Sequence, residues 1–139
     1  MTHPIRSETE AKGSTRQRLT FPTGAVWPVE TQEGGAATQP GAHELFDASL
    51  AACKALTAHW YAQQRSFPLD RVVVELERDD SHERDKDAPW YGLSLTLHFE
   101  GEGLTVEQQK RLHDVVERCP IHKLMTSTEV RITTAPFAP

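Results

Sequence analysis

The chain has 139 residues, of which 15 are Lys or Arg and 20 are Asp or Glu, and its formal net charge is -5. This length suits one domain with a moderate core. The acidic balance excludes the broad basic surface with which proteins bind nucleic acid or anionic membranes. No apolar run reaches the length of a membrane span, and the N-terminus lacks the apolar core of a secretory signal. We therefore expect a cytoplasmic protein that binds neither nucleic acid nor membrane.

The first third of the chain predicts an arm, two short strands and a loop. Residues 1–14 are polar and have no periodicity, which predicts a flexible N-terminal arm, so that a single domain would span residues 15–139. Alternating residues around Leu19 and the apolar segment at 25–29 predict strands. Pro28 favours an edge position for the second strand, because proline has no N–H to donate. The Gly-rich stretch TQEGGAATQPGA predicts a loop.

A long helix is predicted for residues 43–65. This run is rich in Ala and Leu, and its apolar side chains recur every three or four residues. One face carries Phe46, Ser49, Cys53, Leu56 and Trp60, and an adjacent face is also apolar. A helix that is apolar around much of its girth is expected in the centre of a core, so Cys53 should be largely buried.

The second half of the chain predicts two strands, a helix and a final strand. Residues 71–77 are rich in valine and residues 91–99 alternate strictly, which indicates antiparallel strands joined by a charged, solvated hairpin loop. Thr105 and Gln108 form a capping-box pattern that predicts a helix start. The buried face of this helix ends at Cys119, where Pro120 stops simple continuation. Alternation at 130–132 predicts a short last strand. The fold class is α+β, with two main helices packed on a mainly antiparallel sheet.

Two cysteines, Cys53 and Cys119, each lie on an apolar helical face. In a cytoplasmic protein a standing disulfide is uncommon, and a cysteine pair is more often redox-active or metal-binding. Buried free cysteines also serve as small apolar residues. Packing, redox chemistry and metal binding are therefore all open on this evidence alone.

A metal site is the weaker chemical hypothesis. Cys119 and His122 have the spacing Cys-x-x-His, and Cys53 and His43 could add ligands for zinc. The chain has no paired Cys-x-x-Cys motif, however, so the remaining ligands would have to come from distant positions. We expect no resident metal and no bound cofactor.

Two segments, HELFDASLAACKAL and ERCPIHKLM, in this order resemble the OsmC/Ohr superfamily, which includes the osmotically inducible protein C and the organic hydroperoxide resistance protein. The resemblance covers roughly residues 16–134 and is closer to the general OsmC-like branch, because the second motif carries His where the Ohr branch carries Ser. It implies an OsmC-like fold in an intertwined homodimer. Two long central helices would pack against sheets that mix strands from both chains, with active sites at the interface.

The resemblance also implies a chemistry, which is thiol-dependent reduction of organic hydroperoxides in defence against oxidative stress. By position, Cys53 would be the peroxidatic cysteine and Cys119 the resolving cysteine. The electrons would come from an external thiol donor such as a dihydrolipoyl group or dithiothreitol. A peroxidatic thiol must be ionised. An apolar environment raises its pKa, so a cation or a hydrogen-bond donor has to compensate.

In the Ohr branch a Glu at the start of the central helix supports the thiolate. Here the residue ten positions before Cys53 is His43, and Glu44 follows it. Glu44 is therefore a candidate partner of the thiolate. It is also explained as a carboxylate favoured by the helix dipole at a helix start.

An Arg from an early loop completes this support in the Ohr branch, and Arg16 and Arg18 are the candidates here. Either could equally be a surface residue of a strand. His122, near Cys119, could tune that thiol or form a hydrogen bond within its turn.

A catalytically silent protein of the same fold is the alternative from a different functional class. Its apolar pocket would hold a lipid-like or other small ligand. The aromatic residues that could line it are Trp60, Tyr61, Trp90 and Tyr91, although aromatic side chains also pack cores and interfaces.

Overall fold

The computed structural model describes residues 4–31 and 38–139. Contacts within the chain group these residues into two compact units, Met1–Ala48 and Ser49–Pro139, and helix α1 (Ala42–Arg65) begins in the first and ends in the second. Half of the predicted Gly-rich loop falls on residues 32–37, outside the described residues. The single domain expected over residues 15–139 stays a prediction.

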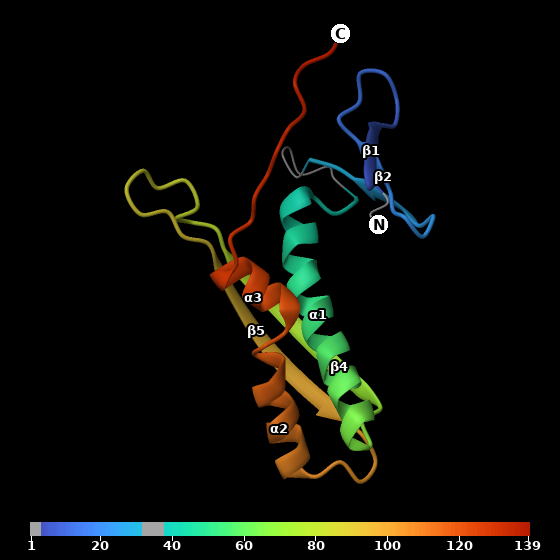
Figure 1. Cartoon of the computed structure of the whole chain (residues 1–139), viewed down its shortest axis with the longest axis vertical. Helices are drawn as coiled ribbons and strands as arrows, with labels where there is room; N and C mark the ends of the chain where they lie inside the picture. The colour runs from blue at the N-terminus through green and yellow to red at the C-terminus, as the bar shows by residue number, and fades with distance from the viewer. Residues whose placement is uncertain (1–3, 32–37) are drawn as a thin grey trace. The chain divides into compact units, whose positions relative to one another are not determined.

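The first unit contains a three-stranded antiparallel sheet in the order β1-β2-β3 (Figure 1). Strand β2 (Gln17–Thr20) is central and pairs with both β1 (Arg6–Thr9) and β3 (Val26–Val29), so that Leu19 lies opposite Trp27 in β3. Pro28 lies in β3 at one edge of this sheet, as its missing N–H predicts.

Residues 6–9, which fall within the predicted N-terminal arm, form strand β1. These residues show no apolar periodicity because three of the four side chains are exposed and the fourth is only partly buried. Backbone pairing with β2 and the ion pair of Glu8 with Arg18 across the two strands hold β1 in place. A strand stabilised in this way leaves no hydrophobic signal in the sequence.

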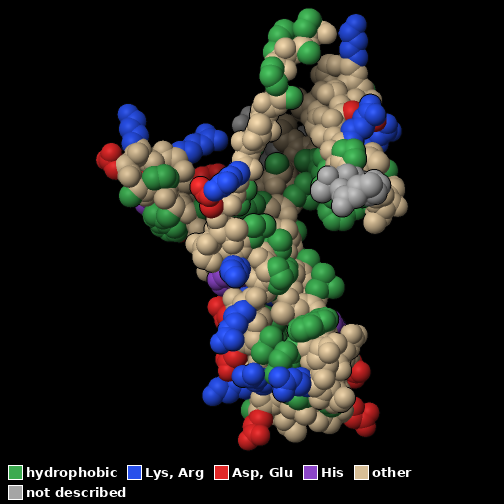
Figure 2. All heavy atoms as spheres, viewed as in Figure 1, with side chains coloured by type: hydrophobic (Ala, Val, Ile, Leu, Met, Phe, Trp, Pro, Cys, Tyr) green, Lys and Arg blue, Asp and Glu red, His purple; other side chains and the backbone are tan. Residues whose placement is uncertain are grey.

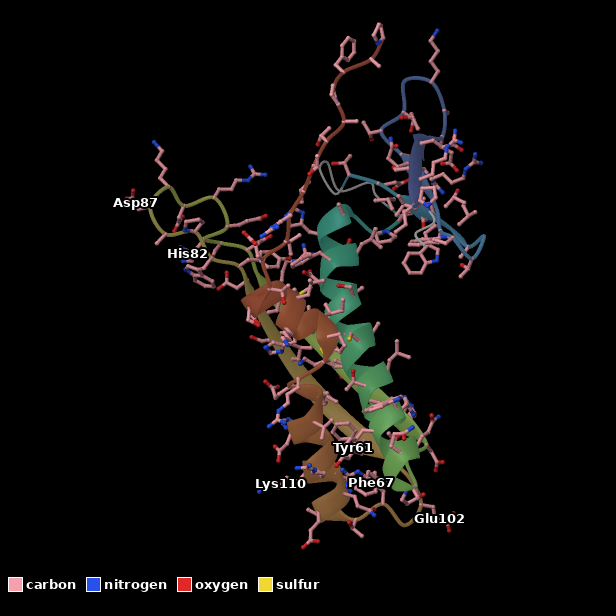
Figure 3. All side chains as sticks on the ribbon, in the orientation of Figure 1. Tyr61, Phe67, His82, Asp87, Glu102 and Lys110 are labelled. Carbon is pink, nitrogen blue, oxygen red and sulfur yellow. The ribbon has the colours of Figure 1, made fainter. Side chains whose placement is uncertain are left out.

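The second unit contains a long antiparallel hairpin of β4 (Arg71–Asp79) and β5 (Gly92–Glu100). Both strands were predicted to within two residues, and the charged loop between them forms the hairpin connection, with His82 and Asp87 on it (Figure 3). Helices α1 and α2 (Val106–Val116) lie beside this hairpin (Figure 1). Their shared core consists of Ala58, Tyr61, Ala62, Phe99, Leu104, Leu112 and Val116.

Helix α2 begins where the capping box predicts. The Thr105 hydroxyl accepts a hydrogen bond from the Gln108 backbone N–H at 3.1 Å, and the Gln108 side-chain oxygen accepts one from the Thr105 N–H at 3.1 Å. The helix ends at Val116 rather than at Cys119. A third helix, α3 (Pro120–Ser127), follows, and the sequence pattern did not predict it. Proline at the first position of a helix loses nothing, because that N–H has no partner inside the helix.

The final strand predicted around Val130 and Ile132 is wrong for the isolated chain. Within the described residues, the segment from 129 onward forms no strand, and both side chains are largely exposed. An alternating pattern becomes a strand only when its backbone groups find a neighbouring strand. The β4–β5 sheet does not take up this segment.

Helix α1 has the predicted extent but buries a different face. Its buried side chains in the second unit are Leu50, Lys54, Ala58, Tyr61 and Ala62, spaced three, four or one residues apart along one stripe. Leu56 and Trp60, on the face that was predicted to be buried, are 69 % and 61 % exposed. Cys53 lies on that face and is half-buried rather than largely buried.

The element order β-β-β-α-β-β-α-α, with antiparallel sheets and two main helices, confirms the predicted α+β class. Within the described residues, no helix combines the length and the apolar character needed to cross a bilayer.

Candidate active site

Cys53 and Cys119 are neighbours in the second unit, and both are free thiols. The Cys53 side chain is close enough to the Cys119 thiol to raise its pKa. Their accessibility differs, since Cys53 is half-buried and the side chain of Cys119 is fully buried. The structure therefore brings together the two residues that the sequence pointed to most strongly.

Cys119 is the N-cap of α3. Its backbone is extended, and its sulfur accepts a hydrogen bond from the His122 backbone N–H at 3.4 Å. The first N–H groups of a helix have no partner within the helix, and a side chain at the cap position can accept from one of them. The Cys-Pro step thus places this sulfur at a helix start, with Pro120 as the first helical residue.

Cys53 lies in the middle of α1, one turn before Thr57, and its sulfur is 4.0 Å from the Thr57 hydroxyl oxygen. Cys53 also lines an open cavity of about 650 Å³, together with Leu56, Trp60 and Val115. This volume is typical of small-ligand sites. Cys119 does not line the cavity, so a molecule that enters it reaches Cys53 first.

The charged part of the cavity wall comes from Arg111 and Asp114 of α2 and from Arg118, which follows the end of that helix. The Arg111 Nε donates a hydrogen bond to the Tyr61 hydroxyl at 2.9 Å, and this bond raises the pKa of Arg111. The Tyr61 ring also packs against Phe67, with their centroids 5.8 Å apart (Figure 3). The cavity wall therefore contains both an apolar surface and fixed charges.

Burial raises the pKa of the Cys119 thiol above its ordinary value, because a thiolate loses hydration there. The neighbouring Cys53 thiol acts in the same direction. The backbone N–H of His122 and the positive charge of Lys54 act in the opposite direction, because both stabilise the thiolate.

Lys54 is the residue of this site that sequence reasoning missed. Its side chain is 1 % exposed, and its Nζ donates to the Val116 carbonyl oxygen at 2.8 Å and lies 3.0 Å from His122 Nδ1. A signal was present in the sequence, because a lysine directly after Cys53 interrupts the apolar stripe between Leu50 and Ala58.

His122 contacts both Cys119 and Lys54. Its backbone N–H donates to the Cys119 sulfur, and its ring lies beside the Lys54 ammonium group. The hydrogen bond within the turn, one of its two predicted roles, is therefore present. The His122 ring nitrogen Nδ1 faces the Lys54 ammonium group, and an ammonium group has no lone pair with which to bind a metal. Among the described residues, no three His, Cys, Asp or Glu side chains gather in a way that could hold a metal ion.

Glu44 lies in the first turn of α1, in the first unit, where its Oε1 accepts a hydrogen bond from the Gly41 backbone N–H at 3.1 Å. This contact is typical of a carboxylate at a helix start. A role for Glu44 at Cys53 stays a prediction.

Arg16 and Arg18 also belong to the first unit, and acidic residues neutralise both. Arg16 pairs with Glu10 at 2.7 Å and with Glu30 at 3.0 Å, and Arg18 pairs with Glu8. The Arg18–Glu8 pair joins β1 and β2, so Arg18 matches the alternative of a surface strand residue, whereas Arg16 lies just before β2. Their assignment to the thiolate of Cys53 likewise stays a prediction.

The aromatic residues considered for a ligand pocket are only partly brought together. Trp60 and Tyr61 line the cavity. Trp90 instead stacks on His82 at the hairpin loop, with ring centroids 4.7 Å apart, and Tyr91 follows it there.

Fold and site together define a class of α+β proteins, in which one half-buried cysteine on a long helix and one buried cysteine at a helix start meet beside a cavity. The family model described as OsmC-like protein matches residues 34–135, and the chain belongs to this family. A search of curated protein sequences found no match.

Solved structures share the fold. The OsmC-like protein from Mycoplasma pneumoniae is 15 % identical, with a TM-score of 0.74 over 91 % of this chain and 89 % of that one. The organic hydroperoxide resistance protein OsmC from Legionella pneumophila is 17 % identical, with a TM-score of 0.65 over 91 % and 92 %. The organic hydroperoxide resistance protein OhrB of Bacillus subtilis is 18 % identical, with a TM-score of 0.61 over 91 % and 92 %. At these identities the likeness establishes the fold.

Proposed function

We propose that this chain is a thiol-dependent peroxidase that reduces organic hydroperoxides, with Cys53 as the peroxidatic cysteine and Cys119 as the resolving cysteine. The observation that carries the proposal is the difference in burial between two adjacent thiols. Cys53 lines the cavity, whereas the neighbouring Cys119 is fully buried and does not line it. The names of two structural neighbours as hydroperoxide resistance proteins agree with this chemistry.

The reaction has three steps. The Cys53 thiolate attacks the terminal oxygen of the hydroperoxide; an S–O bond forms, the O–O bond breaks, and the alkoxide leaves as an alcohol after taking a proton. The Cys119 sulfur then attacks the Cys53 sulfenic acid; an S–S bond forms and the hydroxyl leaves as water with the proton of the Cys119 thiol. An external dithiol, such as a dihydrolipoyl group, finally reduces the disulfide by thiol–disulfide exchange.

The cavity suits an apolar hydroperoxide better than hydrogen peroxide. Leu56, Trp60 and Val115 provide apolar surface next to Cys53, which would bind the organic part of the substrate. The chemistry requires no bound cofactor, since the electrons come from the external thiol. We place the reaction in the cytoplasm, where such donors keep thiols reduced.

We further propose that the working protein is a homodimer. Hydrophobic side chains reach the surface over α1, beside Lys and Arg side chains (Figure 2). They include Leu56 and Trp60, which line the cavity and are more than half exposed. A second copy placed on this face would cover them and complete the cavity wall.

The test is mass spectrometry after one equivalent of cumene hydroperoxide or tert-butyl hydroperoxide. We expect a Cys53–Cys119 disulfide in the wild type, reversed by dithiothreitol. The Cys119→Ser variant should stop at Cys53 sulfenic acid, and the Cys53→Ser variant should keep a free Cys119 thiol. Two thiols that persist in the wild type would contradict the peroxidase.

A small-molecule or lipid-binding protein without turnover is the second candidate, because the cavity has the volume of a ligand site. Native mass spectrometry of the purified protein distinguishes the two. A bound small molecule together with thiols inert to peroxide would favour the binding protein.

A further inference from the structure

Lys54 is a fully buried lysine that lies between two apolar residues of the same helical stripe. Only 1 % of it is exposed, and the residues one turn away on either side in the same stripe of α1, Leu50 and Ala58, are apolar. A buried ammonium group is unfavourable unless hydrogen bonds satisfy it. The hydrogen bonds of Lys54 therefore indicate its role beside the two thiols.

The ammonium group binds both flanks of the turn that carries Cys119. On one flank it donates to the carbonyl oxygen of Val116, the last residue of α2, at 2.8 Å. The same oxygen accepts the Cys119 backbone N–H at 3.2 Å. On the other flank Nζ lies 3.0 Å from Nδ1 of His122, whose backbone N–H donates to the Cys119 sulfur. Each hydrogen bond of Lys54 thus ends on a residue that itself bonds Cys119.

Lys54 also follows Cys53 directly in α1. A single stretch of helix therefore presents Cys53 to the cavity and the Lys54 ammonium group to the Cys119 turn. Any movement of the turn away from α1 would break two hydrogen bonds of a buried cation, which is costly. Lys54 consequently fixes the position of the Cys119 turn relative to Cys53.

The contact with His122 defines a tautomer. An ammonium group has donors and no acceptor, so Nδ1 of His122 must accept and the ring proton must reside on Nε2. This assignment follows from the hydrogen-bond geometry and can be measured directly.

We propose that Lys54 is the positioning residue of the resolving step: it holds the Cys119 turn against α1 and stabilises the Cys119 thiolate as that thiolate attacks the Cys53 sulfenic acid. The step forms the S–S bond and breaks the S–O bond of Cys53, and the hydroxyl leaves as water with the proton given up by Cys119. The assignment to this step rests on the proposed peroxidase function. The positive charge of Lys54 opposes the rise that burial causes in the pKa of Cys119, in agreement with this role.

The test compares Lys54→Met with Lys123→Met, which removes an exposed lysine of α3 as a matched control. Single-turnover mixing with cumene hydroperoxide follows two events, sulfenic acid on Cys53 by dimedone trapping and the disulfide by mass spectrometry. In Lys54→Met we expect disulfide formation to slow by about tenfold or more, because the loss of one charge-assisted hydrogen bond changes a rate or equilibrium constant by about this factor. Sulfenic acid should still form on Cys53. Lys123→Met should match the wild type in both events.

A general loss of structure would slow both events together, so the split between them separates positioning from folding. Equal rates of disulfide formation in Lys54→Met and wild type would overturn the proposal. If Lys54→Met does not fold, the wild type still decides the point, since nitrogen NMR must show the Nε2–H tautomer for His122. A proton on Nδ1 at neutral pH would contradict the hydrogen bond from Lys54.

A second oxidant separates this inference from the peroxidase itself. Diamide takes two hydrogens from a pair of thiols and forms the disulfide without any peroxide. If the wild type ignores hydroperoxide but diamide couples Cys53 to Cys119 more slowly in Lys54→Met, the peroxidase fails and the positioning of Cys119 stands. If diamide gives equal rates in both proteins, the positioning fails, whatever the peroxide does.

Discussion

The two faces of α1 differ in what covers them. One face, with Leu50, Lys54 and Ala58, is buried within the chain. The other face, with Cys53, Leu56 and Trp60, borders an open cavity and keeps large apolar side chains exposed. The buried face contacts the Cys119 turn through Lys54. In the proposed function the open face admits substrate and, in the proposed dimer, faces a second chain. Successive residues of a helix are rotated by about a quarter turn, so Cys53 and Lys54 face different surroundings although they are neighbours in the chain.

The largest expected effect is on turnover, through the open face. Cys53→Ser should lower peroxide consumption with dithiothreitol to the uncatalysed level, because no other thiol lines the cavity in the described part of the chain. The measurement is hydroperoxide loss at steady state. A variant that keeps wild-type turnover would show that the chemistry takes place elsewhere.

The second effect is on stability and uses the same substitution on both faces. Leu50→Ala should lower the free energy of unfolding by about 2–4 kcal/mol, because it leaves a cavity in a packed core. Leu56→Ala should lower it by less than about 1 kcal/mol at protein concentrations where the chain is monomeric, because the side chain is 69 % exposed. Urea unfolding measures both values, and similar losses would refute the distinction between the faces.

The third effect is on association. Leu56→Glu places a charge on the face that a second copy is proposed to cover, and it should weaken the dimer by about 2 kcal/mol or more, a loss typical of a central interface residue. Sedimentation equilibrium measures the dissociation constant. Val106→Glu, at another exposed apolar residue, is the control and should leave association unchanged. A wild type that is monomeric at all concentrations would contradict the dimer itself.

The smallest effect is on the pH dependence of stability. Burial raises the pKa of Cys119 above the ordinary value of a thiol, so the folded state holds this proton more tightly than the unfolded state. The resulting contribution to stability is fully present below the unfolded pKa and is lost as pH rises through the folded pKa. Reduced wild type should therefore lose melting temperature above about pH 9 more steeply than Cys119→Ser. Parallel curves would contradict the raised pKa.

Much of the fold could be predicted from local signals. The capping box at Thr105 places α2, the alternation in β5 places its strand, and Pro28 marks a sheet edge, because each signal acts through neighbouring residues. Strand β1 and helix α3 were missed. The first depends on backbone pairing between polar segments, and the second begins at the proline that seemed to end a helix.

The two thiols of the candidate site could be predicted from the sequence, but the residues that contact them could not. Cys53 and Cys119 stand out as single cysteines on apolar helical faces, and the structure makes them neighbours. Which face of α1 is buried could not be predicted, because both faces are apolar and tertiary packing decides between them. Lys54 was missed for the same reason, since a lysine in a helix is ordinarily solvated and only the buried contacts with Val116 and His122 show otherwise.

The central claim is that peroxide reaches Cys53 first and that Cys119 acts only afterwards. Dimedone trapping tests it most directly, with one equivalent of cumene hydroperoxide added to the Cys119→Ser and Cys53→Ser proteins. We predict a dimedone adduct on Cys53 in the first protein and an unmodified Cys119 in the second. An adduct on Cys119 of the Cys53→Ser protein, or no adduct on Cys53 of the Cys119→Ser protein, would contradict it.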